Sequence, residues 1–198
     1  MLTKSERQTL REKLTEYEGN APHMYLDTNG NVTVGVGHLL STVAAAQKLA
    51  FIVDKTKMKA TPEEIKADFE AVSKLPKVHN NLAPFYKAYT KLVLTQPEID
   101  ALTESHIDNF HSELMRKYVH FSFYPKEVRL ALFDMLFNLG MKKLREMYIR
   151  FNMAIYAKDW QKAADESHRK LPVSTARNRY VKDLLEKAAE YANKNKKP

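Results

Sequence analysis

The stretch "EYEGNAPHMYLDTNGNVTVGVGH", residues 16–38, decides the fold of this chain. It contains four of the five glycines in the sequence. Glycine adopts backbone conformations that other residues avoid, and it lets another group come close to the backbone. The gathering of glycines around Glu18, Asp27 and Thr33 therefore indicates a constrained segment rather than an ordinary surface loop.

A β-hairpin is expected inside this stretch. Asn29-Gly30 lies between two strand-like runs, and this dipeptide is the strongest short-range signal for a hairpin. Side chains alternate between the two faces of a strand. The second run places two kinds of residue on its two faces: Val32, Val34 and Val36 on one, and Thr33, Gly35 and Gly37 on the other. We therefore expect one apolar face and one small, open face.

Helices are expected on both sides of the hairpin. Thr3 and Glu6 have the spacing of a capping box for a helix over 3–17, and Gly19 provides its left-handed end. Apolar residues then recur at three- and four-residue spacing in seven segments: 40–53, 62–74, 95–119, 126–139, 143–157, 159–170 and 175–193. The predicted class is α+β, mostly α, with a small sheet.

The run 128–140 is apolar nearly all round, which predicts a buried central helix that ends at Gly140. Asp134 lies inside this run. A buried carboxylate without a partner is costly, so Asp134 must have a polar or charged partner.

Composition excludes several function classes. The chain has 198 residues, which suits one domain, and it has no cysteine, so disulfides, iron–sulfur clusters and thiol nucleophiles are excluded. No apolar run is long enough for a membrane span, and the charged start "MLTKSERQTLREKL" predicts no secretory signal. The net charge of +8 favours polyanionic partners, although a role in solubility alone is the alternative.

Two carboxylates stand out within the deciding stretch. Glu18 lies at the negative end of the first predicted helix, where the ionised form is disfavoured, as suits a general acid. Asp27 leads into the polar turn and is expected to stay ionised. Two carboxylates in different environments are typical of glycosidases. The spacing alone leaves open that Glu18 is a surface residue and Asp27 an ordinary turn residue.

Other chemistries have little support. Gly35-Val36-Gly37 lacks the third glycine of a dinucleotide fingerprint, and His106, His111 and His120 do not form a zinc motif. Neither a metal nor an organic cofactor is expected. The basic residues are not interleaved with aromatic ones, so no nucleic-acid partner is predicted.

The spacing of the key residues resembles that of the phage-type lysozymes, the muramidase or endolysin family. The resemblance rests on Glu18, an Asp nine residues on, a Thr six further, and the run Gly35-Val36-Gly37-His38. Four later segments are similar more loosely: "LTQPEIDALTESHIDNF", "RLALFDMLFNLG", "AKDWQKAADE" with Trp160, and "TARNRYVKDLL". The resemblance covers about residues 10–40 and 94–190, and the stretch 41–93 departs from it by its length.

This resemblance implies one lysozyme-like domain over 1–198. Its parts would be a hairpin lobe with extra helices over 1–94, a linking helix over 95–119 and a helical lobe over 120–198. It implies a catalytic set and a substrate-binding set: Glu18, Asp27 and Thr33 for the first, and Gly35, Gly37, Leu39, Phe137 and Asn138 for the second. It also implies an ion pair between Glu18 and an arginine, for which Arg179 is preferred and Arg177 stays open.

The implied reaction is hydrolysis, with inversion, of the β-1,4 bond between N-acetylmuramic acid and N-acetylglucosamine in peptidoglycan. The alternative is an inactive peptidoglycan-binding module on the same fold. Glycan strands are the implied partner, an immunity protein or delivery machinery is a further one, and a monomer without membrane insertion is expected. We expect synthesis in the cytoplasm and action on the cell wall, either as a phage endolysin or as an injected antibacterial toxin domain.

Overall fold

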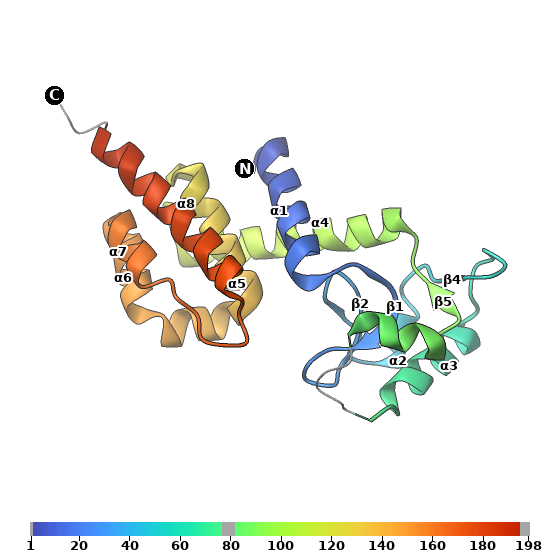
Figure 1. Cartoon of the computed structure of the whole chain (residues 1–198). Coiled ribbons are helices and arrows are strands. Elements are labelled where there is room, and N and C mark those ends of the chain that lie inside the picture. Colours follow the sequence, from blue (N-terminus) through green and yellow to red (C-terminus); the bar gives the residue numbers. More distant parts are fainter. Residues whose placement is uncertain (1, 77–81, 195–198) are drawn as a thin grey trace. The chain divides into compact units, whose positions relative to one another are not determined.

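The computed structural model describes residues 2–76 and 82–194 and is mostly helical, with two small antiparallel sheets (Figure 1). The chain divides into two compact units. We call Arg11–His106 the N-terminal unit and Met1–Leu10 with Ile107–Pro198 the C-terminal unit. The first residues of the chain thus belong with the C-terminal unit, whereas the sequence predicted a first lobe over 1–94.

The N-terminal unit is built around a three-stranded sheet in the order β1-β2-β3. Its elements and the two helices that it shares with the other unit are α1 (Lys4–Glu18), β1 (Ala21–Leu26), β2 (Val32–Gly35), β3 (His38–Leu39), α2 (Val43–Ala46), β4 (Ile52–Val53), α3 (Pro62–Ser73), η1 (Ala83–Tyr89), β5 (Leu92–Val93) and α4 (Gln96–Lys117). The short helix η1 and helix α3 pack against β1, and α2 packs against α3.

The predicted hairpin is confirmed, and so is the end of the helix before it. Gly19 has φ +78°, and its N–H donates to the carbonyl of Thr15, which ends α1 at Glu18. In the turn, the Gly30 N–H donates to the Asp27 carbonyl at 2.9 Å, and Gly30 itself has φ +78°. This left-handed residue returns the chain into β2 in register.

The expectation of an open face on β2 is wrong, because all four residues Val32–Gly35 are buried. Helix α4 covers the Gly35 end of this face: a Cβ built on Gly35 would lie 3.3 Å from Cγ2 of Ile99. Gly35 therefore makes room for the Ile99 side chain rather than for a solvent-filled gap. Sequence alternation identified the small residues correctly, but it could not identify the side chain that approaches them.

Gly35 and Gly19 allow a matched test of this packing. Both have positive φ, but a Cβ on Gly19 would meet nothing within 4 Å. We expect Gly19→Ala to lower the free energy of unfolding by about 1 kcal/mol through the backbone conformation alone. Gly35→Ala should cost about 2–4 kcal/mol, because overpacking against Ile99 adds to the same backbone cost. Urea unfolding of the two variants measures the difference, and equal losses would contradict the packing role of Gly35.

Residues 40–53 differ from their prediction. The sequence predicted a helix there, but only Val43–Ala46 is helical, and Ile52–Val53 forms β4, which pairs with β5 in a second, two-stranded sheet. Thr42 caps the short helix by accepting the Ala45 N–H at 3.1 Å. Pairing with a strand about forty residues away is a non-local interaction that apolar periodicity does not report. Within the irregular stretch 75–93, residues 77–81 lie outside the described part.

The C-terminal unit is helical. Beyond its share of α1 and α4, its elements are η2 (Phe121–Phe123), α5 (Lys126–Met147), α6 (Ile149–Ala157), α7 (Trp160–Asp165) and α8 (Thr175–Lys194). Helix α8 packs against α5 and α7, and α6 packs against α7. The predicted stop at Gly140 is a break within α5, where φ is +72° and ψ is 157°. The predicted helix 143–157 is interrupted at Tyr148, and the one over 159–170 ends at Asp165.

The core of this unit holds the groups that the sequence predicted. Leu132, Met135 and Leu136 of α5 are fully buried, and Trp160 packs edge-on against Tyr124 with ring centroids 5.4 Å apart. The predicted capping box is present, since Thr3 and Glu6 exchange hydrogen bonds of 2.8 and 3.2 Å.

Glu6 does more than cap the helix. Its buried carboxylate also accepts two hydrogen bonds from Arg129, of 2.8 and 2.6 Å. Burial raises the pKa of Glu6, but the hydrogen bonds from Thr3 and Arg129 outweigh it, so the net pKa is lowered. The start of α1 is therefore anchored to α5 by a buried ion pair.

Asp134 has the partners that its burial requires. Its carboxylate accepts Nη1 of Arg169 at 2.6 Å and Nε of Arg177 at 3.0 Å, and all three side chains are buried. Asn178 completes the cluster: its Oδ1 accepts the N–H and Nε–H of Arg169, and its Nδ2 donates to the Arg169 carbonyl. We call these four residues the Asp134 cluster. It joins α5, the segment after α7 and the start of α8.

Candidate active site

The three-stranded sheet brings two of the predicted residues, Thr33 and Leu39, together on one face. Tyr25 of β1 is paired with Thr33 of β2, and Thr33 is paired in turn with Leu39 of β3. Directly paired residues project to the same face of a sheet, with Cβ atoms about 4.5–5.5 Å apart. Thr33 and Leu39 therefore belong to one cross-strand row that also contains Tyr25, a residue that the sequence analysis did not select.

Asp27 follows β1 directly and is held firmly by the turn. Its Oδ1 accepts the backbone N–H groups of Asn29 and Asn31 at 2.9 and 2.8 Å. Its Oδ2 accepts Nδ2 of Asn31 at 3.1 Å. A carboxylate has about four acceptor positions, so Oδ2 keeps capacity for one further donor, such as a water molecule. The "DTNGN" sequence thus fixes the carboxylate while leaving one of its oxygens usable.

Tyr25 lies within electrostatic reach of both predicted catalytic carboxylates. Burial raises the pKa of Tyr25 most, and the negative charges of Glu18 and Asp27 raise it further. The Tyr25 hydroxyl accepts a hydrogen bond from the Gly37 N–H, which lowers the pKa, and the net pKa is about 12. The phenol is therefore protonated at neutral pH and can donate a hydrogen bond. Its place was readable from the sequence, because Tyr25 and Asp27 have the two-residue spacing of one strand face.

Glu18, Asp27 and Thr33 all belong to the N-terminal unit. Glu18 is the last residue of α1 and is half-buried, and Asp27 is half-buried as well. Thr33 is buried, and its hydroxyl donates to the Asn31 carbonyl at 3.2 Å, so its oxygen keeps acceptor capacity. Leu39 and Gly37 are exposed at the end of the sheet. Tyr25 and Thr33 thus place two hydroxyls in one cross-strand row, and the carboxylates of Glu18 and Asp27 lie close enough to Tyr25 to raise its pKa.

The remaining predicted residues belong to the C-terminal unit. Phe137 and Asn138 lie in α5 and are half-buried, and the Phe137 ring packs edge-on against Phe110 at 5.3 Å. Arg177 is buried in the Asp134 cluster, whereas Arg179 is exposed on α8. The ion pair between Glu18 and an arginine stays a prediction.

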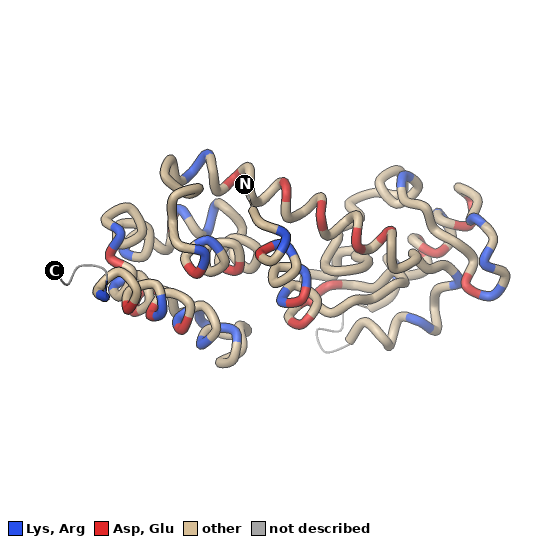
Figure 2. The backbone as a smooth tube through the Cα atoms, turned by 90° about the horizontal axis from the view of Figure 1, so that it is seen from above, with Lys and Arg blue, Asp and Glu red and all other residues tan. Residues whose placement is uncertain are grey.

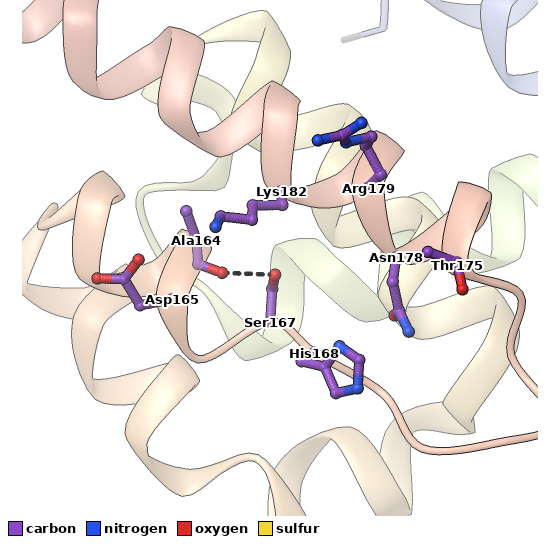
Figure 3. A pocket seen from close by; sticks show the side chains of 8 residues that line it. All are labelled: Ala164, Asp165, Ser167, His168, Thr175, Asn178, Arg179 and Lys182. Atoms are coloured by element: carbon purple, nitrogen blue, oxygen red, sulfur yellow. Dashed lines mark hydrogen bonds between the residues drawn. The ribbon is translucent and has the colours of Figure 1, made fainter.

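Arg179 borders a cavity of about 240 Å³ that lies entirely in the C-terminal unit (Figure 3). The lining comes from α7, the segment after it and α8: Ala164, Asp165, Ser167, His168, Thr175, Asn178, Arg179 and Lys182. Ser167 lies in the middle of this lining and donates its hydroxyl to the Ala164 carbonyl at 2.7 Å. Arg179 and Lys182 give the rim a positive charge that Asp165 offsets in part.

Two half-buried histidines of the N-terminal unit form a polar contact. Nδ1 of His38 lies 3.0 Å from Nε2 of His106, so one ring donates and the other accepts. Burial lowers the pKa of both rings, and the neighbouring His38 lowers that of His106 further. His38 belongs to the Gly-x-Gly-His run, and this contact ties β3 to α4.

The histidine pair predicts a pH dependence of stability. Both pKa values are lower in the folded chain than in the unfolded one, so folding releases protons. The contribution of the pair is complete above about pH 6.5 and is lost as the pH falls through that value toward the folded pKa values. We expect His106→Gln to reduce the stability difference between about pH 8 and pH 5, since glutamine stays neutral. Denaturant unfolding at both pH values measures this, with the exposed His120→Gln as control. An unchanged pH dependence in His106→Gln would refute the role of the pair.

Groups for other chemistries were not found in residues 2–76 and 82–194. This part of the chain contains no set of three or more His, Asp or Glu side chains arranged to hold a metal ion. Over the same residues, no helix has the length and apolar character needed to cross a membrane. Lys and Arg occur along segments of both units (Figure 2). In comparisons with known proteins, neither a family model nor a curated protein matched this chain.

Proposed function

We propose that this chain is a muramidase that hydrolyses the β-1,4 bond between N-acetylmuramic acid and N-acetylglucosamine in peptidoglycan. The observation that carries the proposal is the grouping of Glu18, Tyr25, Asp27 and Thr33 in one unit. Tyr25 and Thr33 are paired across the sheet, and the negative charges of Glu18 and Asp27 raise the pKa of Tyr25. The spacing of Glu18, Asp27, Thr33 and the Gly-x-Gly-His run, which resembles that of phage-type lysozymes, adds support.

Glu18 is the proposed general acid. Its proton passes to the glycosidic oxygen as the bond from that oxygen to the anomeric carbon breaks. Asp27 is the proposed base: the free acceptor position on its Oδ2 takes a proton from the attacking water, whose oxygen bonds to the anomeric carbon from the opposite face. Glu18 gives up one proton and Asp27 accepts one, so the net charge of the site does not change. The attack inverts the configuration at the anomeric carbon.

Thr33 and Tyr25 are proposed to hold the reacting groups in place. The Thr33 oxygen can accept a hydrogen bond from the attacking water, because its own proton is directed to the Asn31 carbonyl. The Tyr25 hydroxyl, fixed by the Gly37 N–H, can donate to a carboxylate oxygen. Neither residue changes its covalent state in the reaction. The cations of the chain would concentrate it on the anionic cell wall, and this effect weakens as salt rises.

Digestion of purified peptidoglycan tests the proposal. We expect the wild-type protein to release disaccharide peptides with reducing muramic acid ends, which mass spectrometry identifies, and NMR of the first-formed anomer should show inversion. Reducing ends on glucosamine would contradict the bond assignment. If the protein sediments with the wall but releases no sugar, the chain is a peptidoglycan-binding module instead.

A further inference from the structure

The C-terminal unit exposes a set of large apolar side chains that the proposed reaction does not use. Between 37% and 84% of the surface of each of these residues is exposed. We call this set the apolar patch: Met115, Val119, Phe123, Met147, Ile149, Met153 and Tyr156. Apolar residues scattered singly need no explanation, but a contiguous group of them indicates an interaction surface.

Helix spacing and two hydrogen bonds connect parts of the patch to one another. Ile149, Met153 and Tyr156 have the i, i+4, i+7 spacing of one face of α6. The Tyr156 hydroxyl donates to the Lys117 carbonyl at the end of α4, at 3.2 Å. On the neighbouring segment, the Ser122 hydroxyl donates to the Met115 sulfur at 3.1 Å.

Buried hydrogen bonds join the segments that carry the patch. Tyr118, which is buried, donates its hydroxyl to Oδ1 of Asn152 on the inner side of α6. Asn152 in turn donates to the carbonyls of Leu144 and Tyr148. The exposed side chains therefore project from helices that are fixed to each other by buried polar bonds, and they do not fold back into the core.

The segments that carry the patch are rich in Lys and Arg, and Lys117 lies next to the Tyr156 ring. Residues 141–159 contain five Lys or Arg and two Asp or Glu, and residues 113–126 contain three and one. Nζ of Lys117 lies 5.0 Å from the centroid of the Tyr118 ring and 5.7 Å from that of Tyr156. Burial lowers the pKa of Lys117 most, and the nearby charge of Arg145 lowers it further, so two cations lie close together at the patch. The acids close by, Glu146 and Glu166, are ion-paired to Arg145 and Arg150.

We propose that the apolar patch binds peripherally to the surface of an anionic lipid bilayer. Apolar and aromatic side chains flanked by Lys and Arg have the composition of interfacial membrane-binding faces, in which the apolar groups enter the acyl boundary. The long side chains of Lys117, Arg145 and Arg150 can keep their charges at the headgroups. A second copy of this chain fits the patch poorly, because it would bring cation against cation.

Vesicle flotation tests this surface. We expect the wild-type protein to float with vesicles of phosphatidylcholine and phosphatidylglycerol, and not with phosphatidylcholine alone. The variant Phe123→Ser/Ile149→Ser/Met153→Ser should bind the anionic vesicles at least about tenfold more weakly than wild type. Arg145→Gln/Arg150→Gln should lose about fivefold in binding for each cation removed, because an interfacial cation contributes roughly that factor.

Matched controls keep the test specific. Met58→Ser and Leu171→Ser remove equally exposed apolar side chains outside the patch and should float like wild type. Circular dichroism checks the fold of each variant. If the apolar triple variant does not fold, the charge variant and a salt series on the wild-type protein still test the proposal. Equal flotation of wild type and the triple variant, or equal binding to both vesicle types, would overturn the proposal. So would a dimer in gel filtration that the triple variant converts to a monomer, because the patch would then bind a second copy.

Discussion

Replacing Glu18 by glutamine is expected to reduce sugar release from peptidoglycan by at least about a thousandfold, because a carboxamide cannot give a proton to the leaving oxygen. The change keeps the size of the side chain and removes only its acid function. Rates of reducing-end formation from purified peptidoglycan, measured at one protein concentration, give the ratio directly. The binding of the variant to intact peptidoglycan should be close to that of wild type.

Glu16 provides the matched control for this experiment. It lies on the same helix two residues earlier, is exposed, and pairs with Lys13 on the surface at 2.6 Å. Glu16→Gln makes the same chemical change and alters the net charge by the same amount, so it should keep wild-type activity. Loss of activity in both variants would indicate an effect of charge rather than of a general acid. Full activity in Glu18→Gln would reject Glu18 as the acid.

The elements that carry the residues of the proposed site could be predicted from the sequence because they are local. Glu18, Asp27 and Thr33 lie within sixteen residues of one another along the chain, and a helix end, a turn and a strand place them. Each of these elements has a strong local signal: the left-handed Gly19, the Asn29-Gly30 turn and the alternation of β2. The predicted helix start at Thr3 is confirmed for the same reason, since Thr3 and Glu6 form a capping box. A second capping box, of Thr61 and Glu64, begins α3.

What the sequence could not predict depends on non-local contacts. The face of β2 was expected to be open because it carries Gly35, but the identity of the covering residue, Ile99, depends on how α4 packs. Strands β4 and β5 are each two residues long, too short for a periodic signal, and they pair across about forty residues. Tyr25 was missed although its spacing from Asp27 placed it on the correct face. An aromatic residue in a strand is most often simply a core residue.

For Asp134, the sequence predicted one feature and could not predict another. Its burial was predicted from the apolar run around it, and so was its need for a partner. The partners themselves come from two separate segments, and one of them, around Arg169, was predicted as the end of a helix over 159–170 but follows the end of α7. An arginine in a polar stretch such as "ESHRK" is usually exposed, and only the fold shows that Arg169 is almost completely buried.

The Asp134 cluster is expected to be the most sensitive point of the C-terminal unit. Asp134→Asn keeps the shape of the side chain but leaves two buried arginines without a carboxylate. Breaking a buried ion pair from one side costs about 3–5 kcal/mol of the free energy of unfolding, because the remaining charge stays buried. Urea unfolding followed by the fluorescence of Trp160, which lies in this unit, measures the loss. Asp183→Asn, an exposed change on α8, should cost less than about 0.5 kcal/mol.

Removing the arginines instead is not expected to rescue the fold. Buried ion pairs can often be replaced by apolar residues of similar volume without loss. Here, however, Arg169 also donates to Oδ1 of Asn178 and to the carbonyl of Arg177. Asp134→Leu combined with Arg169→Met would leave Oδ1 of Asn178 with only the backbone N–H of residue 169 as donor. It would also leave the buried Arg177 without its carboxylate, at about 3–5 kcal/mol. The combined variant should therefore remain less stable than wild type. Wild-type stability in that variant would show that the cluster is a replaceable ion pair and not a connected network joining α5 to the start of α8.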